Sequence, residues 1–185
     1  MDPSSWKKYV ANSSNAKDFA AFSRYRARFR LARGLSAIEV DGLAQSTVDS
    51  YFVALRVTLA YTALESLETA LDVGRETQVI DAKLLTQFLD ERNLDMRMAL
   101  LESISAKEHS KERLQFQKLL DGEVKNLRIA AYAIRNLMAH GVLTANRLGL
   151  DKSKTRRKLL NDLANCVLNT TDDRFTKHVS EVTKS

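Results

Sequence analysis

Apolar residues recur at the three- and four-residue spacing of an α-helix along most of the chain. The longest such pattern begins near Ser46 and ends near Leu71, just before Gly74. Its first residues, Ser46, Thr47 and Asp49, resemble a capping box at a helix N-terminus. The face that we expect this helix to bury consists of Phe52, Leu55, Leu59, Thr62 or Ala63, Ser66 or Leu67, and Ala70.

Shorter stretches with the same spacing predict further helices on both sides of this long one. Ser14 and Asn15 provide a cap for the first of them. Residues 106–117 are strongly charged and fit either a solvated helix or a surface loop, and a basic run at 152–158 opens the last helix. The expected helices cover residues 16–33, 46–71, 81–92, 94–105, 123–140 and about 152–168.

The composition favours a helical fold. One Pro and six Gly are too few turn residues for a β-sandwich or a β-barrel. A chain of 185 residues, of which 44% are hydrophobic, can bury the core of one globular domain. We therefore expect a single all-α domain over residues 1–185, an up-and-down bundle of about five or six helices around those at 46–71 and 123–140. Its core should cover about 15–168, with flexible termini.

The net charge and the rare residue types narrow the range of possible functions. Lys and Arg outnumber Asp and Glu by 29 to 23, an excess compatible with a polyanionic partner. A single Cys, Cys166, excludes a disulfide framework and a multi-cysteine metal site, and three scattered His residues argue against a metal cage. No apolar run is long enough to span a membrane, and the first residues lack the apolar core of a secretory signal. We therefore expect a cytoplasmic protein that uses no metal and no cofactor.

A polar strip follows the helix expected at 123–140. Arg128, Tyr132, Asn136 and His140 are spaced by four residues and so share one face, with Arg135 beside Asn136. The strip flanks an apolar stripe made of Val124, Leu127, Ala131, Ile134 and Met138.

An Arg and a His in this arrangement can cleave RNA without a metal ion. An imidazole, with a pKa of about 6.5, exchanges protons with the 2′-hydroxyl and the leaving oxygen near neutral pH. A guanidinium stays charged and stabilises the negative charge that develops on the phosphate. Arg135 and His140 are therefore candidate catalytic residues, and Asn136 can position one of them. DNA lacks the attacking 2′-hydroxyl and would not be cleaved by this route.

The segment R-N-L-M-A-H, from Arg135 to His140, resembles the signature of the HEPN (higher eukaryotes and prokaryotes nucleotide-binding) superfamily, in which a polar residue follows the Arg. The stretch from Leu59 to Glu65 is similar to the long second helix of that family. The resemblance implies a helical bundle, a homodimer, and a composite site where two copies of the motif helix face each other. It also implies metal-independent endoribonuclease activity, as in members that act in toxin–antitoxin modules, phage defence or RNA processing.

The partners that the resemblance implies are RNA and an antitoxin protein. One HEPN subgroup has a nucleotidyltransferase antitoxin and a Tyr two residues after the His; Val142 occupies that position here, which argues against that antitoxin. Two other functions remain open: a catalytically inactive HEPN module that binds RNA or protein, and an unrelated helical adaptor. Basic and aromatic residues around the motif are candidates for RNA contact: Arg128, Tyr132, Lys152, Lys154, Arg156 and Arg157.

Overall fold

The structure, a computed structural model, describes residues 3–12, 16–74, 77–105, 107–139 and 147–183. These residues are mainly helical and contain no β-strand, which confirms the all-α prediction. They form eight α-helices and one 3₁₀ turn, more helices than the spacing predicts. The elements are α1 (Pro3–Asn12), α2 (Ala16–Gly34), α3 (Gln45–Ala70), α4 (Ala82–Leu89), the turn η1 (Glu91–Asn93), α5 (Leu94–Ser103), α6 (Ser110–Leu120), α7 (Arg128–Ala139) and α8 (Lys154–Val182).

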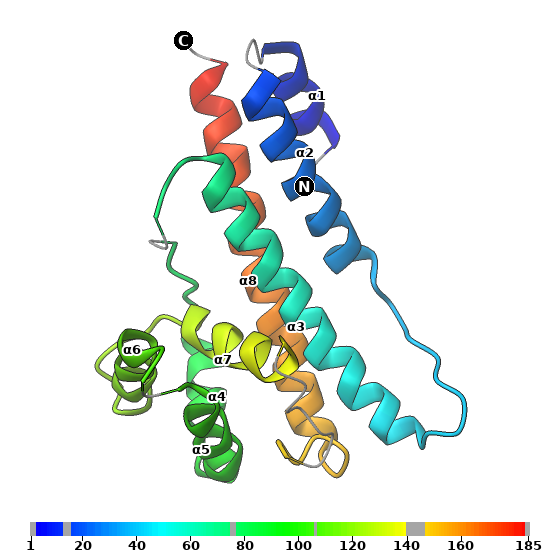
Figure 1. Cartoon of the computed structure of the whole chain (residues 1–185), viewed down its shortest axis with the longest axis vertical. Helices are drawn as coiled ribbons and strands as arrows, with labels where there is room; N and C mark the ends of the chain where they lie inside the picture. The colour runs from blue at the N-terminus through cyan, green and yellow to red at the C-terminus, as the bar shows by residue number, and fades with distance from the viewer. Residues whose placement is uncertain (1–2, 13–15, 75–76, 106, 140–146, 184–185) are drawn as a thin grey trace.

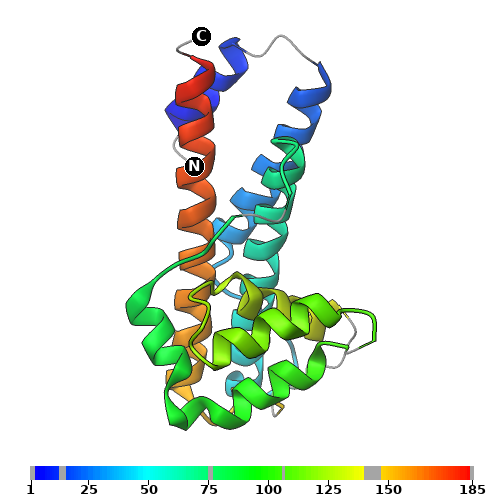
Figure 2. The same ribbon diagram turned by 90° about the vertical axis from the view of Figure 1, so that its left-hand side faces the viewer.

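Three long helices, α2, α3 and α8, set the length of the molecule (Figure 1). α2 runs antiparallel to α3, whereas α8 runs parallel to α3, so the chain must return along the molecule before α8 begins. It does so through an extended segment and the helices α4 to α7, which cluster across the lower ends of α3 and α8 (Figure 2). The helix bundle is confirmed: successive helices alternate in direction from α1 to α3, whereas α7 crosses the long helices instead of running along them.

Both ends of the chain add helix beyond the expected core. α8 continues past residue 168 to Val182 because Phe175 and Val179 are buried on that extension. α1 covers the same end of α8, and the rings of Trp6 and Phe175 stack with their centroids 6.3 Å apart. Aromatic packing therefore orders a helix that the periodicity did not predict.

α3 fully buries the predicted face only in its C-terminal part, at Ala63 and Leu67. Val53, Val57 and Leu64 are covered by neighbouring helices, whereas Phe52 and Leu59 are only partly buried. The helix is apolar on nearly every side, so its periodicity could not identify the face that α2, α7 and α8 cover.

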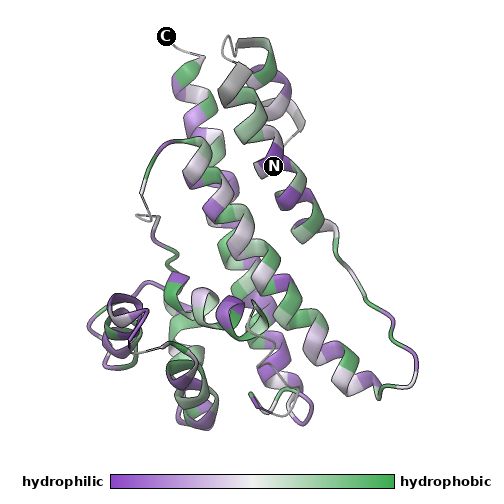
Figure 3. Cartoon of the chain, viewed as in Figure 1, coloured by the Kyte–Doolittle hydropathy of each residue, from purple (hydrophilic) through white to green (hydrophobic). Residues whose placement is uncertain are grey.

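Helix starts also differ from the prediction. α3 begins after Ala44 without a capping side chain, so the predicted capping box is wrong. The cap expected at Ser14 and Asn15 lies outside the described residues. The charged stretch forms a surface helix, α6, which is drawn largely as hydrophilic in Figure 3 and is anchored by the buried side chains of Phe116 and Leu119.

α7 begins at Arg128 instead of residue 123 because the preceding residues hydrogen-bond to the segment between α3 and α4. The backbone N–H of Leu127 donates to the carbonyl oxygen of Val79 at 2.8 Å. The Asn126 side-chain oxygen accepts from the N–H of Val79 at 2.9 Å and from that of Arg128 at 3.1 Å. These bonds hold the first turn of α7 against the segment between α3 and α4.

Candidate functional site

The polar strip of α7 points into the protein. Arg128, Tyr132 and Asn136 are 6%, 4% and 2% exposed, because α3, α5 and α6 pack around this helix. Arg135 is half-buried, and Ala139 at the helix end is exposed. The spacing correctly placed these residues along one helix, but the strip is part of the core and not a surface beside it.

Arg128 is held in an ion pair and is not available to RNA. Its Nη2 atom donates to Glu68 Oε2 at 2.7 Å, and Nη1 donates to the other carboxylate oxygen. The guanidinium also lies over the ring of Tyr61, 5.5 Å from the centroid. A buried guanidinium neutralised in this way joins α3 to α7, so the predicted RNA contact of Arg128 is not supported.

Tyr132 is packed between two other rings. Its ring lies edge-on to Tyr61, with centroids 5.9 Å apart, and edge-on to His109 at 6.1 Å. Stacking on a base requires an exposed ring face, which a side chain that is 4% exposed does not offer. The structure therefore gives Tyr132 a packing role in place of the predicted RNA contact.

Arg135 and Asn136 form the part of the predicted catalytic group that the structure describes. Arg135 Nη1 donates to Asn136 Oδ1 at 3.2 Å. Because a guanidinium can only donate, this bond fixes the amide oxygen toward Arg135 and turns the amide nitrogen away from it. Within the described part of the chain, that buried nitrogen has no hydrogen-bond partner. His140, the third member of the group, lies outside the described residues, as does Val142.

A cavity of about 280 Å³ lies beside Asn136, and we call it the His109 cavity. One wall is α7, and the opposite side comes from the end of α5 and the connection to α6. No sequence pattern indicated His109 or Arg147, because neither shares a helical face with the motif; the α5–α6 connection and the start of the 147–153 turn bring them there. The lining residues are Glu102, Ser103, Ser105, Glu108, His109, Asn136, Leu137 and Arg147.

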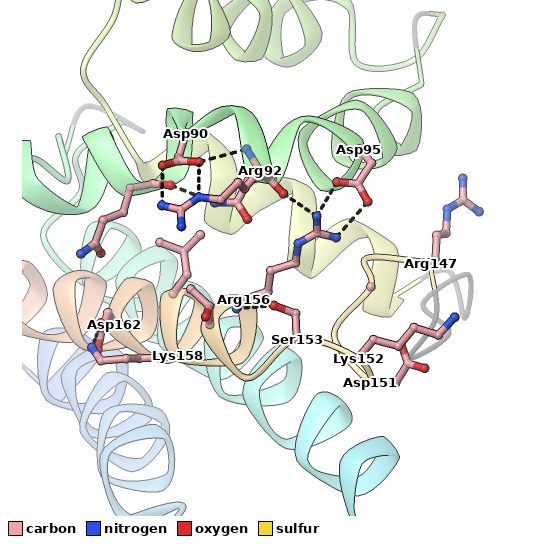
Figure 4. Close-up of a pocket in the computed structure, with 15 residues that line it drawn as sticks. Asp90, Arg92, Asp95, Arg147, Asp151, Lys152, Ser153, Arg156, Lys158 and Asp162 are labelled. Carbon is pink, nitrogen blue, oxygen red and sulfur yellow. Dashed lines mark hydrogen bonds and ion pairs between the residues drawn. The ribbon is translucent and has the colours of Figure 1, made fainter.

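The predicted basic run lines a cavity of about 650 Å³ (Figure 4). We call it the Arg156 cavity. One side of this cavity consists of η1 and the start of α5, and the other side is the start of α8. Its basic side chains are Arg92, Arg147, Lys152, Arg156 and Lys158, and its acidic side chains are Asp90, Asp95, Asp151 and Asp162.

Arg156 is a structural link in this cavity. Its guanidinium donates to the Asp95 carboxylate at 2.9 Å, to the carbonyl oxygen of Arg92 at 2.6 Å and to that of Leu148 at 3.2 Å. The hydrogen bonds from Arg156 outweigh the small effect of burial and lower the pKa of Asp95. Arg156 is therefore neutralised and ties α8 to α5, which argues against the phosphate contact that we expected of it.

Arg157 is also engaged by the protein. It donates to the carbonyl oxygens of Leu150 at 2.5 Å and Asp151 at 3.2 Å, and lies 3.9 Å from the Asp49 carboxylate. The predicted RNA contact is again not supported, because these bonds hold the turn before α8.

Lys152 and Lys154 are exposed, so they remain the predicted RNA contacts of the basic run. Figure 4 shows Lys152 and Arg147 at the opposite end of the Arg156 cavity from Lys158 and Asp162. Arg147 lines both this cavity and the His109 cavity. Arg147 therefore connects the cavity beside Asn136 with the exposed lysines at the start of α8.

Comparisons with known proteins give no family. The chain matches no protein-family model, and no curated protein and no solved structure matches it. Within the described residues, no group of three or more His, Cys, Asp or Glu side chains could hold a metal ion. None of the described helices has both the length and the apolar character needed to cross a membrane.

Proposed function

We propose that this protein is a metal-independent endoribonuclease of the HEPN type. The observation that carries the proposal is the Arg135–Asn136 pair at the end of α7. A half-buried guanidinium bonds the oxygen of a buried amide whose nitrogen has no partner among the described residues, and both groups lie within the six-residue motif that ends at His140. Surface arginines that have no functional role are usually solvated or paired with carboxylates. Arg135 instead bonds a neutral amide, so its full positive charge is retained for an anionic ligand.

Each residue of the motif has a distinct role in the proposed reaction. The imidazole of His140 moves the protons: one leaves the 2′-hydroxyl as its oxygen attacks phosphorus, and one reaches the 5′-oxygen as the P–O5′ bond breaks. Arg135 stabilises the charge on the non-bridging oxygens, and Asn136 orients Arg135. The products are a 2′,3′-cyclic phosphate and a 5′-hydroxyl, so atoms balance without a metal ion or a cofactor.

The proposed active form is a homodimer through α7. At its C-terminal end, Arg135, Met138 and Ala139 are the residues with accessible surface, and they lie on one side of the helix. A second copy on this face would bring two motifs around one RNA strand. We further propose that the protein acts in the cytoplasm as a toxin, a phage-defence effector or an RNA-processing enzyme, with an antitoxin protein as a partner in the first case.

The test is cleavage of single-stranded RNA by the purified protein in EDTA. We expect wild type to cleave and His140→Ala to be inactive, with Arg30→Ala as a matched control on the exposed side of α2. Cyclic phosphate ends should be found on the products. Equal cleavage by all variants would identify a contaminating nuclease and contradict the proposal. RNA binding by wild type without cleavage would favour the inactive HEPN module instead.

A further inference from the structure

We propose that the His109 cavity binds one unpaired base of the RNA strand, and that guanine fits it best. This inference rests on the proposed function, because it identifies part of the substrate of the same site. The cavity adjoins Asn136, so a base held there would fix the register of the strand relative to Arg135.

The buried amide of Asn136 supplies a hydrogen-bond donor for a ligand. The side chain is 2% exposed, and its nitrogen has no partner within the described residues. The bond from Arg135 occupies the oxygen and fixes the amide orientation. A buried donor without a partner is energetically unfavourable, and a ligand acceptor in the cavity would remove that penalty.

The charges around the cavity favour a base over a phosphate. Glu102 and Glu108 line it together with one guanidinium, that of Arg147, and the imidazole of His109. Two carboxylates would repel a phosphate, but they accept hydrogen bonds from the N–H groups of a base. Guanine has two adjacent donors, N1–H and N2–H, beside the acceptor O6. It can therefore bond a carboxylate and the Asn136 amide at the same time.

His109 provides a ring that the protein holds in place. Tyr132 lies edge-on to it at 6.1 Å. The backbone N–H of His109 donates to the carbonyl oxygen of Ser105 at 2.9 Å, and the Arg113 guanidinium donates to that of Ile104 at 2.9 Å, so hydrogen bonds tie His109 and α6 to the end of α5. His109 is only partly buried, and a fixed, accessible ring is a stacking surface for a base.

The size and position of the cavity agree with one base on a longer strand. Its volume of about 280 Å³ is just below the roughly 300–1,000 Å³ typical of sites for whole drug-sized ligands. Arg147 also lines the Arg156 cavity, where Lys152 is exposed. The strand that leaves the base site therefore meets positive charge suited to its phosphates.

The experiment measures binding separately from cleavage. Full-length protein carrying His140→Ala is titrated with fluorescent oligouridylates that hold a single central G, A, C or U. We expect the G-containing strand to bind about tenfold more tightly, as one bidentate base contact provides. Adding Glu102→Gln and Glu108→Gln should abolish the preference, whereas Glu123→Gln, an exposed carboxylate outside both cavities, should preserve it. The exposed positions of Glu102 and Glu108 make unfolding of the variant unexpected, and its melting temperature checks this.

The ring is tested with His109→Phe, which keeps a stacking face, and His109→Ala, which removes it; we expect the preference to survive the first and not the second. Equal affinity for all four strands, or a preference that the paired glutamate substitutions leave intact, would overturn the inference. So would competition by inorganic phosphate at the G-specific site. Guanine preference in a protein whose wild type cleaves no RNA would support the base site while contradicting the proposed catalysis.

Discussion

Glu68 and Arg128 are 60 residues apart in the sequence and form a two-point ion pair inside the bundle, with Arg128 Nη2 2.7 Å from Glu68 Oε2. Their side chains are only 4% and 7% exposed. The backbone N–H of Thr77 also donates to the Glu68 carboxylate, at 3.2 Å. This pair holds the first turn of α7 against α3, so it positions the helix whose other end carries the proposed catalytic residues.

Breaking this pair should strongly destabilise the protein. Arg128→Met leaves the Glu68 carboxylate buried without its counter-charge, and we expect a loss of about 3–5 kcal/mol in the free energy of unfolding, measured by urea denaturation. The double variant Glu68→Leu, Arg128→Met removes both charges and should recover most of that loss. A single variant as stable as wild type would show that the pair does not form in solution.

The same pair predicts a pH dependence of stability. Burial by itself would raise the pKa of Glu68, but the hydrogen bonds from Arg128 and Thr77 outweigh it and hold the pKa below its ordinary value of 4.5. A carboxylate with a lowered folded-state pKa stabilises the protein above its unfolded-state pKa, and that contribution is lost as the pH falls through the folded-state value. Wild type should therefore exceed Glu68→Gln in stability at pH 7, by a margin that shrinks at pH values below 4.5. A margin independent of pH would argue against an ionised Glu68.

The Cys166 thiol should react slowly in the folded protein. Burial, and secondarily the negative charge of Asp81, raises the pKa of this thiol from 9.0 to about 11. Because only the thiolate reacts, alkylation by iodoacetamide at pH 8 should be about 100-fold slower in native protein than in denaturant. Ellman's reagent provides an independent measure of the same ratio. Equal rates in the two conditions would mean that Cys166 is exposed and unperturbed.

Lys152 and Lys154 of the basic run should respond to substitution differently from Arg156. Replacing exposed Lys152 and Lys154 with Ala should weaken RNA binding and reduce the slope of log K against log salt by roughly 1.4, since each phosphate neutralised on a single strand contributes about 0.7. The melting temperature should not change. Arg156→Ala should instead lower the melting temperature, because Arg156 ties α8 to α5. If the lysine substitutions leave the salt slope intact, the RNA is bound elsewhere on the surface.

The sequence predicted the class of fold and the location of the motif helix because both depend on local spacing. It failed where the outcome depends on long-range packing. α3 is apolar on several sides, and only the positions of α2, α7 and α8 decide that Val53 and Val57 are fully buried and Phe52 only partly. The extension of α8 to Val182 depends on aromatic residues contributed by α1, far away in the sequence.

In the candidate site, too, local spacing predicted some features and long-range packing decided the others. Spacing brought Arg135 and Asn136 together, and their hydrogen bond agrees with the proposed pairing of those two residues. It could not distinguish a solvated arginine from a buried one: Arg128 has a partner in α3, and Arg156 has one at the start of α5. The connection between α5 and α6, which no periodicity describes, places His109 in the cavity that Asn136 lines.

The most direct test of the proposed catalysis is the initial rate of RNA cleavage by Arg135→Ala, compared with wild type in EDTA. Arg135 is only half-buried and bonds a neutral amide, so the variant should melt within a few degrees of wild type. If the guanidinium stabilises the developing charge, the rate should fall by about 10²–10³-fold, with a 2′,3′-cyclic phosphate on the remaining product. An unchanged rate in a folded variant would contradict the proposal that this helix end is the catalytic site.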